Sequence, residues 1–184
     1  SSGDVRTNFS NFNASQNAGK ALFFSRRAQC ADCHVNERQG NQVILQGDEA
    51  RNNGLDPNLV NDDNGVGDIS GNLNDNGKFK APSLRDISLT APYMHDGRFS
   101  SLSQVIEHYN SGVQPHPNLD RRLRTQDNRV RRLNLSNTEK QNLEDFLETL
   151  TDVDLISDTR FSDPFKASRP MPGLTAIISL LLKD

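Results

Sequence analysis

The sequence predicts an all-α domain with long irregular loops and an unusually thin core. Two segments place apolar residues at helical spacing directly after a capping box, and no stretch alternates apolar and polar residues as a half-buried strand does. Only 33% of the 184 residues are hydrophobic, and with the 12 glycines the share reaches about 39%, below the roughly 45–50% of an average soluble domain. The chain must therefore fold around a small core or around a group that is not amino acid.

Composition excludes several classes of protein. The longest apolar run, residues 174–182, is nine residues long, far short of the roughly 20 that a membrane-spanning helix needs. The net charge of −3 argues against nucleic acid as the main partner. No basic segment followed by an apolar one opens the sequence, so we expect any export signal to have been removed or never to have been present.

The first predicted element is a helix that begins at Ser15, a suitable N-cap residue. Its apolar residues lie within 18–23, and Gly19 is small enough to let a second helix approach closely. Residues 1–14 are rich in Asn and Ser, and we expect a flexible arm there. The helix leads toward the two cysteines of the chain.

These cysteines belong to the most informative motif in the sequence. Cys30 and Cys33 stand three positions apart and His34 follows directly, which is the C-x-x-C-H signature of c-type haem attachment. Two thiols on one helical turn can reach the two vinyl groups at one edge of a porphyrin, and the imidazole then lies beneath the iron. The motif therefore predicts one covalent haem c with His34 as an axial ligand.

Other uses of the motif fit the sequence less well. A thioredoxin-type pair needs a βαβ context, whereas here an amphipathic stretch precedes the motif and a polar loop follows it. A structural zinc site needs two further ligands at a regular spacing, and His95, His108 and His116 provide no such pair. A plain disulfide leaves His34 without a role.

The second axial ligand of a six-coordinate haem is normally Met or His. Of the two methionines, Met94 lies in a loop bounded by a proline and a glycine, 60 residues after His34. Met171 lies between two prolines in the tail, a poor place for a rigid ligand. We expect Met94 to bind the iron; His95 is the nearest competitor, and a gap-filling core methionine is the alternative interpretation of Met94.

Between the two ligands lies a segment, residues 52–77, in which 18 of 26 positions are Asn, Asp or Gly. That composition is typical of a long turn-rich loop without a packed element. The ligand spacing of an EF-hand is absent. A calcium ion held by loop carbonyls and a set of solvated turns are both open interpretations.

Two further helices follow the methionine loop. Ser101 and Gln104 form a capping box before a one-sided apolar pattern that ends near Gly112, and Ser136 and Glu139 repeat this arrangement before a second helix. Helix, haem motif, long loop, methionine loop and two helices follow one another in the order of a cytochrome c fold wrapped around one covalently attached haem.

Charged and apolar segments complete the organisation of the chain. Six arginines lie within 121–132 and an acidic block spans 136–163; a solvated surface is the default interpretation, and an electrostatic docking patch is the alternative. We expect the cytochrome c domain over 15–165. The tail, 166–184, would form a short apolar helix that packs back on the domain or covers a neighbouring chain.

Two longer motifs are far more specific than C-x-x-C-H alone. F-K-x-P-S-L-R occupies 79–85 and A-P-Y-M-H-D-G occupies 91–97, with weaker matches at 19–24 and 145–151. Through them the chain, over about residues 15–165, resembles the C-terminal haem domain of the bacterial dihaem cytochrome c peroxidase and MauG family.

The resemblance implies a high-potential haem bound by His34 and Met94, which accepts electrons from a donor and passes them to a peroxidatic haem in a neighbouring domain. It places Arg85 near the haem propionates, where a guanidinium can form charge-assisted hydrogen bonds. It also implies calcium between the two domains, held in part by the loop around 75–77.

The sequence departs from the family because it contains a single C-x-x-C-H motif, so the peroxidatic haem domain is absent from it. An iron with His and Met ligands has no open position for peroxide. We therefore expect this chain alone to transfer single electrons without turning over peroxide, or to be the electron-accepting part of a dihaem peroxidase. A module that binds no haem is the third interpretation.

Location and partners follow from this chemistry. Haem is attached to reduced thiols beyond the bacterial inner membrane, so we expect a periplasmic or extracellular protein. The expected partner is a redox protein or a neighbouring catalytic domain, with no role for nucleic acid and no membrane span.

Overall fold

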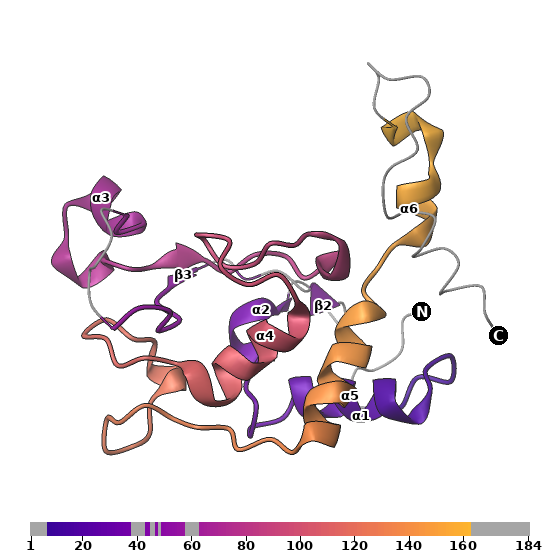
Figure 1. Ribbon diagram of the computed structural model, residues 1–184, viewed down its shortest axis with the longest axis horizontal. Helices are drawn as coiled ribbons and strands as arrows, with labels where there is room; N and C mark the ends of the chain where they lie inside the picture. Colours follow the sequence, from indigo (N-terminus) through magenta and orange to yellow (C-terminus); the bar gives the residue numbers. More distant parts are fainter. Residues whose placement is uncertain (1–6, 38–42, 45–46, 48, 58–62, 163–184) are drawn as a thin grey trace. The chain divides into compact units, whose positions relative to one another are not determined.

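The computed structural model describes residues 7–37, 43–44, 47, 49–57 and 63–162, and these are mostly helical with four two-residue strands (Figure 1). The predicted helical class is confirmed, whereas the short strands were not expected. The chain divides into two compact units, Ser1–Thr151 and Asp152–Asp184, which are described separately. The predicted limits of the cytochrome domain, 15 and 165, stay predictions.

Helix α1, Ala14–Phe23, begins one residue before the expected N-cap. Asn13 is the cap: its side chain accepts from the Gln16 N–H at 2.8 Å, and the Gln16 side chain accepts from the Asn13 N–H at 2.9 Å. The prediction of Ser15 as the cap was therefore wrong. Ser15 lies in the first turn, and its hydroxyl donates to Asn142 at 2.7 Å.

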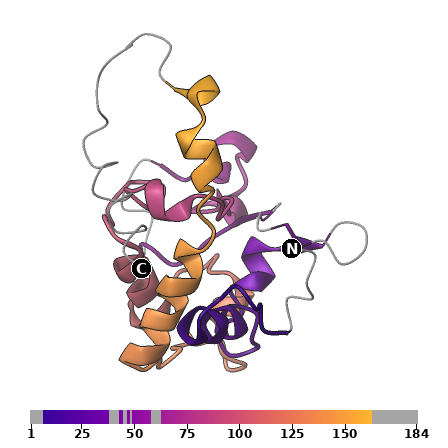
Figure 2. The same ribbon diagram turned by 90° about the vertical axis from the view of Figure 1, so that its right-hand side faces the viewer.

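Helix α1 crosses helix α5, Asn137–Glu148, in both views of the chain (Figures 1 and 2). The expected close approach at Gly19 is confirmed, because a Cβ there would lie 1.7 Å from the Asn142 carbonyl oxygen. One turn further on, the rings of Phe23 and Phe146 pack at a centroid distance of 5.3 Å. The crossing therefore holds the end of α1, which precedes the cysteine motif in the chain, against α5.

The strands pair locally and close loops. Strands β1, Asn36–Glu37, and β2, Val43–Ile44, form one antiparallel pair, and β3, Ala50–Arg51, pairs with β4, Phe79–Lys80. The β3–β4 pair brings together the two ends of the long loop 52–77. Strands this short carry no alternating pattern, which explains why sequence periodicity missed them.

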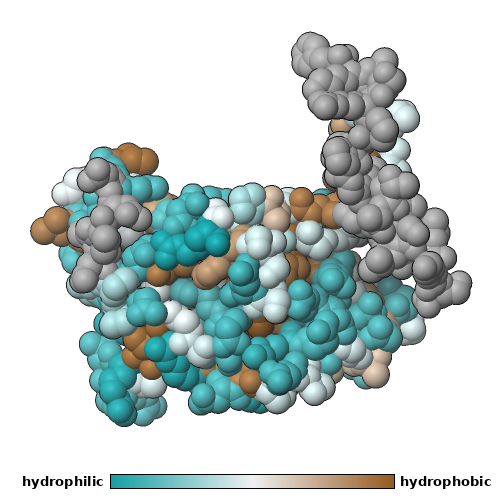
Figure 3. Space-filling view, viewed as in Figure 1, coloured by the Kyte–Doolittle hydropathy of each residue, from teal (hydrophilic) through white to brown (hydrophobic). Residues whose placement is uncertain are grey.

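The long loop contains more structure than its composition indicated. Helix α3, Val66–Ser70, and a 3₁₀ turn, Leu73–Asp75, lie within it, so the expectation of a loop without any packed element was wrong. Gly67 permits this packing, since a Cβ there would lie 1.9 Å from the Asn76 side-chain oxygen. Ile69 and Leu73, which lie in this loop, are 90% and 78% exposed. The surrounding surface is mostly hydrophilic on the face that Figure 3 shows.

The two predicted capping boxes are both confirmed. Ser101 and Gln104 cap helix α4, Leu102–Glu107, which continues as a π-helical turn to Gly112, and Ser136 and Glu139 cap α5. The buried core lies where α1, α4 and α5 meet, and Cys30 and Tyr109 pack against its edge. The core residues are Phe23, Leu84, Ile106, Leu133, Leu135, Leu143 and Phe146.

Much of the arginine segment binds backbone carbonyls. Arg124 donates to the carbonyls of His116, Pro117 and Leu119 at 3.1, 2.7 and 2.9 Å. Arg131 donates to the Arg27 carbonyl at 3.0 Å, directly before the cysteine motif. These guanidiniums therefore add side-chain hydrogen bonds to an irregular segment and stabilise it.

The second unit contains helix α6, Val153–Ser157, capped by the Asp152 side chain, and a 3₁₀ turn, Thr159–Phe161. The predicted tail helix, 166–184, lies outside the described residues. No helix in the described part of the chain is long and apolar enough to cross a membrane.

Candidate haem site

The C-x-x-C-H motif forms a single helical turn. Helix α2, Ala31–His34, starts directly after Cys30, whose carbonyl accepts from the N–H groups of Cys33 and His34 at 3.2 and 3.1 Å. Both cysteines are free and partly buried. The three predicted residues therefore lie together, as attachment to one porphyrin edge requires.

Both thiols are held in the neutral form. Burial raises the pKa of Cys30 to about 12, with a further contribution from Cys33, and burial likewise raises the pKa of Cys33. Cysteines of redox-active C-x-x-C motifs have lowered pKa values, because thiolate is their reactive form. This environment therefore disfavours the thioredoxin-type interpretation.

The imidazole of His34 is oriented by the loop that carries the F-K-x-P-S-L-R motif. Its Nδ1 lies 3.3 Å from the carbonyl oxygen of Pro82, which accepts a hydrogen bond when Nδ1 is protonated. That tautomer leaves Nε2 with a free lone pair, as an axial ligand requires. Burial lowers the pKa of His34, and the contact with Pro82 opposes this effect. The neutral ligand form is therefore favoured.

Met94 occupies a tightly held loop. Its backbone is left-handed, with φ of +73°, a conformation that is costly for a non-glycine residue and tends to occur at functional sites. Tyr93 and Phe99 bracket the loop: the Tyr93 N–H donates to the Phe99 carbonyl at 2.7 Å. The Tyr93 hydroxyl donates to the Ile87 carbonyl at 2.8 Å. The loop thus presents one defined methionine.

The Met94 sulfur has a partner that sequence reasoning missed. The Asn53 side-chain amide donates to Met94 Sδ at 3.3 Å. Asn53 comes from the segment after β3, 41 positions earlier in the chain. No local pattern reveals a contact over that separation, and a run of asparagines in a turn-rich loop gives no reason to choose this one.

The other candidate residues lie elsewhere. The ring of His95 is exposed and stacks on that of Phe79 at a centroid distance of 3.8 Å. Arg85 is exposed, and its backbone N–H donates to the Ser83 hydroxyl at 3.2 Å; its role toward a propionate stays a prediction. Met171 lies outside the described residues.

Charged groups surround the cysteine turn. The Arg51 guanidinium pairs with Asp120 at 2.8 Å, and the Asp120 side chain is only 9% exposed. Hydrogen bonds from Arg51 and from the Arg122 N–H keep the pKa of Asp120 low although burial alone would raise it. Within the described residues, Arg131 Nε is buried without a hydrogen-bond partner, and its guanidinium acts electrostatically on Cys30 and Cys33. An orphaned donor beside both thiols fits a site that is completed by a further group.

A second group of ligand-type side chains involves the methionine loop itself. Asp56, His95 and Asp96 bring their ligand atoms within 4.8 Å of one another, the only such group found in the described part of the chain. Arg98 already pairs with Asp56 at 3.0 Å and also contacts Asp96. Arg98 therefore compensates part of the charge of the two carboxylates and occupies their oxygens, so the group is better described as an ion-pair cluster than as a metal site.

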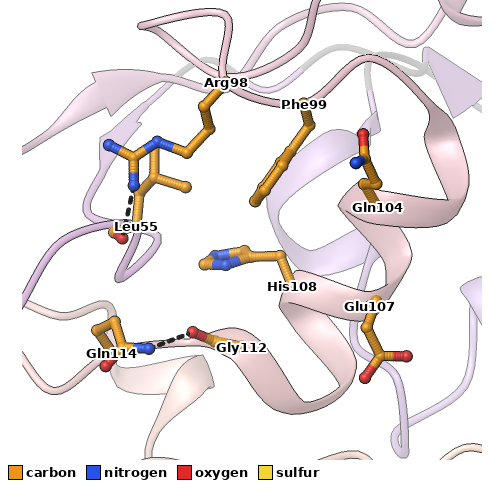
Figure 4. Close-up of a pocket in the computed structure, with 8 residues that line it drawn as sticks. All are labelled: Leu55, Arg98, Phe99, Gln104, Glu107, His108, Gly112 and Gln114. Carbon is orange, nitrogen blue, oxygen red and sulfur yellow. Dashed lines mark hydrogen bonds between the residues drawn. The ribbon is translucent and has the colours of Figure 1, made fainter.

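An open hollow of about 390 Å³ lies next to this cluster (Figure 4). The rings of Phe99 and His108 face it from the methionine loop and from the turn after α4, with centroids 5.9 Å apart. His108 Nε2 also lies 3.0 Å from the Asn53 carbonyl. The segment that contacts Met94 also reaches the hollow directly, because Leu55 lines it (Figure 4).

Comparison with known proteins finds relatives that match parts of this chain. No protein-family model matches the chain. It is 40% identical over 72 residues to the methylamine utilization protein MauG of Methylorubrum extorquens, covering 39% of this chain and 18% of that protein. It is 38% identical over 92 residues to the cytochrome-c peroxidase IdrP1 of Pseudomonas sp., covering 50% of this chain and 22% of that protein.

A solved structure agrees with these sequence matches. The crystal structure of a MauG-like protein associated with microbial copper homeostasis superposes with a TM-score of 0.69 at 31% identity, covering 85% of this chain and 49% of that one. The fold and the relatives together support a c-type cytochrome domain. Its homologues are MauG proteins and cytochrome c peroxidases, which confirms the resemblance found in the sequence. The chain spans about a fifth of the length of these curated relatives.

Proposed function

We propose that this chain is an electron-transfer domain of a c-type cytochrome, with one haem c attached to Cys30 and Cys33 and with His34 and Met94 as axial ligands. The observation that carries the proposal is the C-x-x-C-H turn itself, in which two neutral thiols adjoin a histidine whose Nδ1 already faces the Pro82 carbonyl. Homology to MauG proteins and cytochrome c peroxidases supports haem c binding.

Each residue then has a distinct task. The two thiols hold the group covalently, the Pro82 carbonyl fixes the imidazole of His34, and the left-handed loop presents the thioether of Met94. A haem held in this way supplies one-electron uptake and release. A thioether ligand raises the reduction potential of a haem compared with a second histidine. With Met94 as a ligand, the haem would therefore act as an electron acceptor more readily than as a strong reductant.

The second candidate function is the electron-accepting domain of a dihaem cytochrome c peroxidase. The specific observation that favours it is coverage: the matched region is 22% of IdrP1, and the chain spans 49% of the MauG-like structure. In that case peroxide turnover belongs to a domain outside this sequence, and this chain delivers electrons to it.

Further proposals concern surroundings and partners. We place the protein in the periplasm or on an extracellular face, with a redox protein or a neighbouring catalytic domain as its partner. Calcium would draw on the loop around 75–77, where the Asp75 carboxylate accepts from Lys78 Nζ at 3.0 Å. An ion bound there would have to compete with this lysine.

The test begins with the full chain, exported and matured in a bacterium that attaches c-type haem. We expect one covalent haem per chain by pyridine haemochrome and intact mass, and none in a Cys30→Ser, Cys33→Ser variant. The ferric protein should show the far-red absorption band of a methionine sulfur bound to haem iron. Peroxide turnover by this chain alone with a reduced donor would contradict the electron-transfer proposal, and absence of covalent haem would contradict both functions.

A further inference from the structure

The amide of Asn53 has an unusual environment for a loop asparagine. It comes from a turn-rich segment, yet its Nδ2 donates to the sulfur of Met94 at 3.3 Å. Thioether sulfur is a weak acceptor, and exposed asparagines in loops ordinarily bond to their own backbone or to water. A partly buried amide that contacts a thioether across 41 residues therefore calls for an explanation in terms of the methionine.

The backbone around Asn53 is fixed on both sides and at the residue itself. The Asn52 carbonyl accepts from the Asp120 N–H at 3.0 Å, and the Gly54 carbonyl accepts from the Gln114 N–H at 2.7 Å. The Asn53 carbonyl lies 3.0 Å from His108 Nε2, within hydrogen-bond distance. Because three successive carbonyls are engaged, the amide projects from an anchored segment.

Gly54 contributes to this anchoring. Its φ is +65°, and a Cβ there would lie 2.7 Å from both the Gln114 carbonyl oxygen and a methyl carbon of Val113. Only glycine combines that backbone conformation with so close an approach. The turn that carries Asn53 is therefore pressed against the segment after α4.

The side chain is also held from a second direction. Tyr109 packs against the core, and its ring lies 5.2 Å from that of His108. Burial raises the pKa of Tyr109 to about 12, and the Asn53 side chain, which lies close enough to interact with the phenol, opposes this rise. The phenol is neutral at every physiological pH, so this contact persists.

From these contacts we infer that Asn53 is a positioning residue for Met94: its amide, held by Tyr109 and by an anchored backbone, occupies one lone pair of the sulfur and leaves the other for the haem iron. This rests on the proposed function, since it concerns the Met94 ligand of that haem. A thioether has two lone pairs, and without a donor the sulfur can present either one. The amide also withdraws electron density from the sulfur, which disfavours the ferric state relative to the ferrous state.

The test compares Asn53→Leu with the wild type, both as matured holoprotein. Imidazole added to the ferric protein competes with the methionine, so its apparent Kd reports how firmly the sulfur is bound. Loss of one hydrogen bond should tighten imidazole binding about five-fold, and the reduction potential should fall. Tyr109→Phe, which leaves the amide without its phenol partner, should give a smaller change in the same direction.

Asn118→Leu is the matched control. The Asn118 amide donates to the carbonyls of Leu73 and Asn76 at 2.7 and 3.1 Å, and it makes no hydrogen bond with Met94 among the contacts of the described residues. This variant should lose thermal stability while keeping the wild-type imidazole affinity and potential. A merely structural role for Asn53 predicts the same behaviour for Asn53→Leu, and that outcome overturns the inference.

Two safeguards keep the experiment decisive. If Asn53→Leu does not take up haem, Asn53→Asp replaces it in the imidazole titration, because it keeps the shape of the side chain and lacks the N–H donor when ionised; unchanged affinity there also overturns the inference. A wild type that lacks covalent haem or the far-red methionine band refutes the proposed function instead, before any variant is compared.

Discussion

The crossing of α1 and α5 makes a quantitative prediction for Gly19→Ala. The new Cβ would lie 1.7 Å from the Asn142 carbonyl oxygen and 2.9 Å from Phe146 Cβ, and neither can yield easily because one belongs to backbone and the other to a buried ring. Overpacking typically costs about 1–3 kcal/mol, and this contact belongs at or above the upper end. The higher helix propensity of alanine offsets about 1 kcal/mol.

The net loss is therefore about 2–3 kcal/mol, which corresponds to a fall in Tm of about 4–12 °C for a protein of this size. Thermal unfolding of the holoprotein, followed by far-ultraviolet circular dichroism, measures it. The control is Gly71→Ala, where no atom lies within 4 Å but φ is +66°, so that only the backbone penalty of about 1–2 kcal/mol applies. A Gly19→Ala protein with the Tm of the wild type, or with a higher Tm than Gly71→Ala, would refute the close crossing.

Three further predictions concern the Glu107–Lys140 ion pair, Arg124 and Met94. Hydrogen bonds from Lys140, Ser111 and Asn110 lower the pKa of Glu107 to about 2, so its contribution is fully present above pH 4.5 and is lost as pH falls toward 2. Because the Glu107–Lys140 pair is half-exposed, Glu107→Gln should reduce the loss of unfolding free energy between pH 4.5 and pH 2 by no more than about 1 kcal/mol. Urea unfolding at a series of pH values measures this loss, and an unchanged loss would contradict the pairing. Arg124→Ala should lower the free energy of unfolding by about 2 kcal/mol in the same assay, since three carbonyls lose their donor. The control, Arg121→Ala at an exposed position, should change it by no more than about 0.5 kcal/mol. Equal losses would argue against the carbonyl contacts. Met94→Ala should keep covalent haem but lose the far-red band and lower the reduction potential, and persistence of the band would exclude Met94 as the ligand.

Local sequence signals predicted the helices well. The capping boxes at Ser101 and Ser136 depend on residues three positions apart, so their pattern is complete within the sequence. The same reasoning failed at Ser15, because Asn13 is an equally suitable N-cap residue and forms a reciprocal capping box with Gln16. The choice between adjacent caps depends on where the helix must lie against α5, which a local pattern does not contain.

The long loop shows a second limit of sequence reasoning. Its content of Asn, Asp and Gly indicated turns, yet α3 forms there because Gly67 admits the Asn76 side chain and Gly71 closes the helix in a left-handed conformation. Glycine was counted as a breaker, although here it provides space and a C-cap. Its effect depends on the neighbour that it admits.

The candidate site divides in the same way. Cys30, Cys33 and His34 form one turn, and a motif on one turn is visible in sequence. The groups that orient the ligands come from elsewhere: the Pro82 carbonyl lies 48 positions from His34, and Asn53 lies 41 positions from Met94. Backbone carbonyls and single amides carry no signature, so these contacts emerge only when the fold brings the segments together.

The low hydrophobic share of the chain has a physical explanation if a haem completes the core. Cys30 and Tyr109 already pack at the edge of the buried cluster, and a porphyrin attached there adds apolar surface that no residue count includes. The stability of the fold and the presence of the haem should therefore be coupled.

The most direct test is the intact mass and thermal unfolding of the matured chain beside its Cys30→Ser, Cys33→Ser variant. We expect the wild type to carry one covalent haem and to unfold in a single cooperative transition, and the variant to lack covalent haem and to be largely unfolded. A wild type of unmodified mass, or a variant that unfolds as cooperatively as the wild type without haem, would contradict the central claim that this fold is built around one covalent haem.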